Sequence, residues 1–162
     1  MADGRTEPRI TLSLVDRLID LEPESSQEMP MGASEEARQL KDALCRDLTA
    51  LLNTRRAQAD FDPSYTESTN SLLTFGIVDF ASHNLKSALN QEQVRRSVER
   101  AIRQFEPRLS RVAVTMEEPD PLRPALRFQI SAVLRMETAD PVFFDVTLHR
   151  ESRRFAVAGT NG

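Results

Sequence analysis

One stretch of the chain, from Leu126 to Met136, has an apolar residue at every second one of its eleven positions. Its apolar members are Leu126, Phe128, Ile130, Ala132, Leu134 and Met136. A period of two places successive side chains on opposite faces of a β-strand. The pattern therefore predicts a long strand with one apolar face, which requires a surrounding sheet and a second layer of structure over that face.

Shorter alternating runs lie on either side of this strand. Their apolar positions are Val112, Val114 and Met116 before it, and Val142, Phe144, Val146, Leu148, Phe155 and Val157 after it. Residues 117–124 are acidic and rich in proline and residues 150–153 are charged, so both segments are predicted to be turns. Short connections favour antiparallel pairing of neighbours, and the sequence predicts a three- to four-stranded antiparallel meander.

Two amphipathic helices are predicted ahead of the strands. The first is expected from Ser34, as its N-cap, to about Asn53, and the second from Asn90, as a cap paired with Gln93, to Phe105. Their apolar stripes are Ala37, Leu40, Leu44, Leu48, Leu51 and Leu52, and Val94, Val98, Ala101, Ile102 and Phe105. The fold class is predicted to be α+β, with the helices packed on one face of the meander.

The remaining segments suggest how the chain is organised. Residues 1–33 are predicted to hold a short amphipathic helix, beginning near Ser13, and a linker rich in Pro, Ser and Glu. Residues 34–158 would form the α+β domain, and residues 159–162 a disordered tail. Between the helices, residues 71–75 are expected to make one or two helical turns that Gly76 closes in the left-handed conformation.

Composition narrows the possible functions. The formal net charge is -4. Cys45 is the single cysteine, which excludes an internal disulfide. One cysteine and two histidines also disfavour a zinc cluster. No cofactor is expected. Neither a signal-like apolar run nor a membrane-length one occurs, so the chain is predicted to be cytoplasmic without direct membrane insertion. The basic residues of the second helix have no aromatic residues among them, and nucleic-acid binding is not expected.

The junction between the second helix and the first strand is the candidate functional site. There Glu106, Pro107 and Arg108 follow the helix directly, and Arg103 and Arg111 lie on either side. Proline fixes its own φ and pushes the preceding residue away from helical angles, so the two charges should sit at a stiff corner. This favours a docking site. The alternative is a local ion pair or simple solvation of the helix end.

The same residues carry a resemblance to a known family. Residues 47–56 read Asp-Leu-Thr-Ala-Leu-Leu-Asn-Thr-Arg-Arg and residues 71–80 read Ser-Leu-Leu-Thr-Phe-Gly-Ile-Val-Asp-Phe. Together with residues 13–18 and 100–111, in this order and spacing, they resemble the contractile-tail baseplate wedge family. That family includes a phage protein long labelled a tail lysozyme and the TssE subunits of the bacterial type VI secretion system, and TssE is the closer match.

The resemblance implies a structural and non-catalytic role. The chain would link the baseplate wedge to the first ring of the contractile sheath and initiate sheath assembly, at the cytoplasmic face of the inner membrane. Glu106, Pro107 and Arg108, with Arg103 and Arg111, would contact wedge proteins of the TssF, TssG and TssK type. The C-terminal strands would receive strands from sheath proteins of the TssB and TssC type, because an edge strand offers unpaired backbone groups.

The old label of the phage protein raises one other possibility, a glycoside hydrolase that cleaves peptidoglycan. Such enzymes need two carboxyl groups about 5 to 9.5 Å apart around a bound sugar. Glu106 has no obvious partner in the sequence; Asp145, Glu117 and Glu118 are the nearest candidates. The chain has no Trp and one Tyr to stack on a sugar, which disfavours this function.

Overall fold

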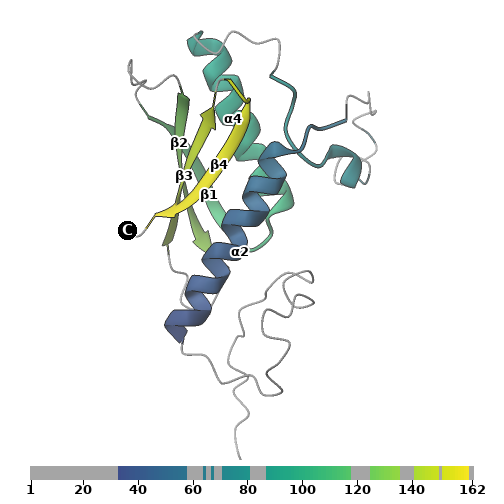
Figure 1. Cartoon of the computed structure of the whole chain (residues 1–162). Coiled ribbons are helices and arrows are strands. Elements are labelled where there is room, and N and C mark those ends of the chain that lie inside the picture. The colour runs from purple at the N-terminus through teal and green to yellow at the C-terminus, as the bar shows by residue number, and fades with distance from the viewer. Residues whose placement is uncertain are drawn as a thin grey trace, which may run out of the picture.

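Two helices and a four-stranded sheet make up the fold. The computed structural model describes residues 33–57, 64, 67, 71–80, 87–117, 125–135, 141–149 and 151–160. The elements are α2 (Ala33–Asn53), the 3-10 helix η1 (Leu72–Thr74), α4 (Ala88–Phe105), β1 (Leu109–Met116), β2 (Ala125–Leu134), β3 (Pro141–His149) and β4 (Arg154–Thr160). The strands follow the order β1-β2-β3-β4 and each neighbouring pair is antiparallel. The predicted meander and the α+β class are confirmed (Figure 1).

The core lies between the sheet and the two helices, which pack on one side of it (Figure 1). All four strands contribute to it, most of all through the even-numbered residues of β2 and β3, and Phe128 and Phe144 are fully buried. Leu44 and Leu48 of α2 and Val98 of α4 are also fully buried and close the other side of this core. The predicted stripes are therefore the buried ones, except that Phe105 is only partly buried and Ala37 is exposed.

The ends of the helices differ from the prediction. Ala37 is exposed, because the first turns of α2 extend past the sheet (Figure 1). Helix α2 begins at Ala33, so Ser34 lies inside it and is not its cap. Helix α4 begins at Ala88 after Ser87, which makes no side-chain capping bond, so Asn90 is not the cap either. Ala88 and Leu89 lie off the apolar stripe of α4. The periodic pattern therefore did not reveal the first two residues of the helix.

The ends of the outer strands also differ. Strand β1 starts at Leu109, ahead of the alternating run, and its register shifts between Ser110 and Ala113, where Arg111 has a φ of 51°. This bulge breaks the alternation that would have revealed the strand's first residues. Strand β4 continues to Thr160, so the predicted tail is wrong for residues 159 and 160. Residues 161 and 162 lie outside the described part of the chain.

The segment between the helices is attached to the end of α2. Ser71 caps η1, as its hydroxyl accepts from the Leu73 N–H, and Gly76 has a φ of 101°. The predicted helical turn and left-handed glycine are confirmed. A Cβ on Gly76 would lie 2.3 Å from the carbonyl oxygen of Thr54, so only glycine fits this close approach. Ile77 then donates its N–H to the same oxygen at 2.9 Å, which fixes the segment beside α2.

The predicted N-terminal helix and most of the linker, residues 1–32, lie outside the described residues. Residue 33 belongs to α2.

Candidate docking site

The corner between α4 and β1 is built from a helix end, a tight turn and a strand start. Glu106 follows the last helical residue with φ −117° and ψ 84°, and its N–H still donates to the carbonyl of Ile102. Leu109 donates its N–H back to the Glu106 carbonyl at 3.2 Å and closes the turn. Arg135, at the end of β2, donates its N–H to the Arg108 carbonyl at 2.9 Å. The backbone of the corner is therefore held from both sides.

The carboxylate of Glu106 points into the protein, and the residue as a whole is only 5% exposed. Its Oε1 accepts from the backbone N–H of Arg108 at 3.1 Å and from Nε at 2.7 Å, and its Oε2 accepts from Nη2 at 2.5 Å. Arg108 Nη2 also donates to Asp47 Oδ2 of α2 at 2.5 Å. The hydrogen bonds that Arg108 donates to Glu106 raise the pKa of Arg108, and the bond to Asp47 adds to this effect.

Glu106 and Arg108 therefore form the local ion pair that the sequence analysis gave as the alternative to a docking role for these two charges. The three charged groups Asp47, Glu106 and Arg108 form a cluster that joins α2 to the corner; we call it the corner cluster. Asp47 was missed at the sequence level. A signal existed, because Asp47 follows the buried Leu44 by three positions and precedes the buried Leu51 by four, which places a charge on the apolar stripe.

The other three predicted residues lie on the surface. Pro107 and Arg111 are exposed, and the side chain of Arg103 is 59% exposed. Arg103 also donates from Nη2 to the carbonyl of Val112 at 2.7 Å and pairs with Glu99 at 2.7 Å. The five predicted residues therefore divide into a buried pair and three surface residues around it.

Helix α4 protects the outer edge of β1 with a second arginine. Arg95 donates from Nη1 to the carbonyl of Val114 at 3.0 Å. Val114 lies two residues after Val112, and its carbonyl also points away from β2. Glu92 and Glu99 hold Arg95 from both sides at 2.8 and 2.6 Å. Arg95, followed by Arg96, lowers the pKa of Glu92 to about 2. Arginines therefore occupy two outward carbonyls of β1, which blunts this edge for strand pairing.

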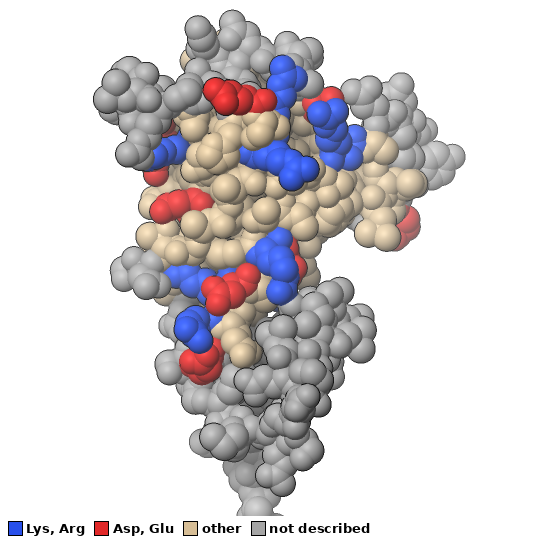
Figure 2. All heavy atoms as spheres, viewed as in Figure 1, with Lys and Arg blue, Asp and Glu red and all other residues tan. Residues whose placement is uncertain are grey.

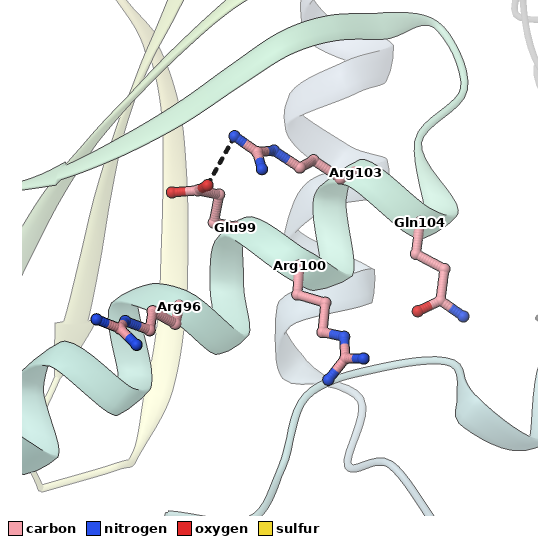
Figure 3. Close-up of a pocket in the computed structure, with 5 residues that line it drawn as sticks. All are labelled: Arg96, Glu99, Arg100, Arg103 and Gln104. Carbon is pink, nitrogen blue, oxygen red and sulfur yellow. Dashed lines mark ion pairs between the residues drawn. The ribbon is translucent and has the colours of Figure 1, made fainter. Parts of the chain in front are cut away.

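A shallow hollow of about 500 Å³ lies along the exposed side of α4. It is lined by Arg96, Glu99, Arg100, Arg103 and Gln104. Figure 3 shows Arg103 and Glu99 pointing toward each other, while Arg100 and Gln104 project from another side of the helix. Three arginines against one glutamate give the hollow a positive charge, which suits an acidic partner surface. On the face in Figure 2, basic and acidic side chains are interspersed, with no continuous basic field.

The carboxyl groups considered for glycoside hydrolysis are not brought together around a groove. Asp145 is exposed on β3, on the sheet face opposite the core, whereas the carboxylate of Glu106 is buried on the helix side. Glu117 is exposed just after β1, and Glu118 lies outside the described residues. Both oxygens of Glu106 are already occupied by Arg108. The acids named from the sequence that lie in the described residues, Glu106, Glu117 and Asp145, therefore do not form the pair that such hydrolases use.

Comparison with solved structures shows that the fold is known. A chain from the structure titled the baseplate complex from the type VI secretion system is 18% identical, with a TM-score of 0.51 over 75% of this chain and 98% of that one. A protein of Geobacter sulfurreducens described as a "putative tail lysozyme" is 14% identical, with a TM-score of 0.45 over 83% and 98% of the two chains. No curated protein matches the sequence.

In the described part of the chain, no helix has the length and apolar character needed to span a membrane. The sequence model of one family, described as baseplate wedge protein gp25, matches residues 38–139. This range contains the corner cluster, both helical stripes and the first two strands. The chain therefore belongs to the baseplate wedge protein gp25 family, and its role is that of a structural baseplate protein.

Proposed function

We propose that this chain is a baseplate subunit of a type VI secretion system, which links wedge subunits to the contractile sheath and initiates sheath assembly. The observation that carries the proposal is the family match over residues 38–139, because it covers the whole corner from Arg103 to Arg111. The likeness in fold to a chain of a type VI secretion baseplate complex supports the choice of machine. The chain would work at the cytoplasmic face of the inner membrane.

In this proposal the corner is the contact with the wedge. Pro107 and Arg111 are exposed, and Arg103 lines the hollow along α4, so a wedge protein of the TssF, TssG or TssK type can reach them without unfolding the chain. Glu106 and Arg108 act differently, since their charges are turned toward each other and toward Asp47. They hold the surface residues in place. Specificity then comes from the shape and positive charge of the corner.

The contact with the sheath is assigned to the C-terminal strands. A four-stranded meander has two outer strands, β1 and β4, and an outer strand can pair with an extended segment of another protein. Arg103 and Arg95 blunt the edge of β1, which favours β4. Sheath proteins of the TssB and TssC type are the proposed partners. No catalytic step is required, and the protein is proposed not to be an enzyme, because Glu106 is bonded on both oxygens and faces away from Asp145.

Co-purification from cells that express the wedge proteins tests the wedge contact. Reversing both surface charges, with Arg103→Glu and Arg111→Glu, should reduce recovery of wedge proteins at least tenfold. The melting temperature should fall, because Arg103 also bonds the Val112 carbonyl and Glu99, so recovery is compared at a temperature at which circular dichroism shows the variant to be folded. The matched control is Arg38→Glu, which reverses an exposed arginine near the start of α2, far along the chain from the corner. Wild-type recovery by the double variant would overturn the assignment of these residues.

A further inference from the structure

Exposed apolar side chains gather on the segment between the two helices. In the described part of the chain four large hydrophobic residues are exposed, and three of them, Leu72, Leu73 and Val78, lie within seven positions. Leu72 is 86% exposed and Leu73 is 55% exposed. Exposed apolar residues that lie singly are common on protein surfaces, whereas a group of them marks a contact with another molecule. We call Leu72 and Leu73 the leucine pair.

The leucine pair is carried by a well-fixed turn. Thr74 is only 2% exposed, and its hydroxyl donates to the Ser71 carbonyl at 2.9 Å. Arg56, just after α2, donates its N–H to the Ile77 carbonyl at 2.8 Å. None of these bonds involves a leucine side chain, so the turn would keep them with polar residues at positions 72 and 73. The fold alone therefore does not explain why these two exposed positions are apolar.

The same turn packs against the last turn of α4. The rings of Phe75 and Phe105 meet edge to face, with their centroids 5.2 Å apart. Gln104, which lines the basic hollow, donates from Nε2 to Thr74 Oγ1 at 3.3 Å. Arg100 lies one helical turn before Gln104 and projects from the same side of α4 (Figure 3). The leucine pair and the hollow are therefore neighbouring parts of one surface, next to the corner.

Arg100 is the cation of this surface that is open to a partner. Arg96 is paired with Glu92 and Arg103 with Glu99, each at 2.7 Å. Arg100 is exposed, and no carboxylate among the described residues forms an ion pair with it. An acidic side chain of another protein can therefore bind Arg100 without displacing a bond of the fold.

The backbone around the leucine pair is already hydrogen-bonded, which favours a helix as the partner. Thr74 donates its N–H to the Ser71 carbonyl and Phe75 donates to the Leu72 carbonyl, both at 3.1 Å. An extended segment binds largely through backbone bonds, whereas a helix satisfies its own and binds through side chains. A second copy of this chain is the poorer occupant, because symmetric pairing would bring two basic hollows together.

We propose that the leucine pair and Arg100 bind an amphipathic helix of a wedge protein, whose apolar stripe covers the leucines and whose acidic flank pairs with Arg100. The identity of the partner rests on the proposed function, whereas the surface and the chemistry of the helix rest on the contacts just described. The hollow follows α4 from Arg96 to Gln104. This is about 12 Å along the axis, enough for about two turns of a bound helix.

Co-purification with co-expressed TssF- and TssG-type proteins of the same genome tests the leucine pair. The double variant Leu72→Ser with Leu73→Ser should recover at least tenfold less of them, while its melting temperature stays near that of the wild type because both side chains are exposed. The matched control is Leu89→Ser. Leu89 is 69% exposed and lies at the other end of α4, about 22 Å along the axis from Gln104.

The control should recover wild-type amounts. Equal recovery by the double variant and the wild type would contradict the role of the leucine pair and leave the proposed function standing. A wild type that recovers no wedge protein would instead overturn the proposed function, and the partner named for this surface with it.

Charge reversal tests the acidic flank of the helix. Arg100→Glu should lower recovery of the same proteins at least tenfold, because it places a negative charge where the helix presents its own. Arg38→Glu reverses another exposed arginine, on α2, and should leave recovery unchanged. Wild-type recovery by Arg100→Glu would rule out the acidic contact.

Photo-crosslinking identifies what covers the leucine pair. Benzoylphenylalanine placed at position 72 of the full chain should crosslink to a wedge-protein peptide that has apolar residues three and four positions apart and acidic residues beside them. The same group at position 89 should give no such product. A crosslink from position 72 to a sheath protein, to a second copy of this chain or to a wedge peptide with strand-like alternation would overturn the proposal.

Discussion

The guanidinium of Arg108 lies 2.5 Å from the carboxylate of Asp47, although 61 positions separate the two residues in the sequence. Arg108 is also bonded to Glu106, its neighbour across one proline. The contact therefore joins the first helix to a turn formed much later in the chain. It fixes the direction in which the exposed part of the corner points.

Replacing Arg108 with Met should lower the free energy of unfolding by about 3 kcal/mol or more, because Glu106 would keep a buried charge without its partner. Adding Glu106→Met should recover a large part of this loss, since removing both partners of a buried pair is less costly than removing one. Urea unfolding of the two variants and the wild type measures both effects. Equal stability of Arg108→Met and the wild type would show that Glu106 finds another donor.

The alternation of β2 predicts unequal effects at adjacent positions. Phe128→Ala empties a fully buried site between the sheet and the helices and should cost about 3–5 kcal/mol. Gln129→Ala, on the exposed face of the same strand, should change stability by less than about 0.5 kcal/mol. Thermal and urea unfolding check the pair. Similar losses for the two variants would mean that both faces of β2 are covered.

Gly76→Ala should destabilise the protein by more than about 1 kcal/mol. The added Cβ would meet the Thr54 carbonyl oxygen at 2.3 Å, and the backbone there has a positive φ. Gly159→Ala is the matched control, because its Cβ would meet Lys41 Cε at 2.5 Å, the far end of a side chain that can move. The melting temperature should fall clearly for the first variant and only slightly for the second.

The pKa of Glu92 should be about 2, below its ordinary value of 4.5, because Arg95 and then Arg96 donate to its carboxylate. A carboxyl group with a lowered pKa in the folded state stabilises that state above its ordinary pKa, and this contribution is lost as the pH falls through 2. Titration of the side-chain carbonyl signal by NMR measures the midpoint. Arg95→Gln should raise it more than Arg96→Gln does; the reverse order would contradict the geometry of the pair.

Periodicity was enough to predict the sheet and most of the core. The alternating residues around Phe128 and Phe144 became the buried face, since a strand offers one face to a single covering layer. Its limits lie at the strand ends. The bulge at Arg111 disrupts the alternation of β1, and Gly159 continues the core-facing series of Phe155 and Val157 without a side chain that would reveal it.

The candidate site was predictable in part. Proline geometry located the corner and the two neighbouring charges suggested either docking or pairing, but the sequence order of Glu106 and Arg108 does not tell which way their side chains turn. Burial decided this, through Asp47 on a distant helix. Long-range partners of this kind depend on packing between elements, which local patterns do not specify. The helix start at Ala88 was missed for a local reason, because Ser87 makes no capping bond and the first two helical residues are exposed and lie off the apolar stripe.

The Arg108 carbonyl receives an N–H from β2, and the Arg108 side chain reaches α2. A pull on Pro107 would thus be shared among four elements, two of them joined to the tip by covalent bonds. When several bonds share an applied force, each carries only part of it, and the group withstands a larger force than the same bonds loaded in sequence. When a contractile assembly shortens suddenly, a corner anchored in this way would transmit the force to neighbouring subunits without detaching from the rest of the fold.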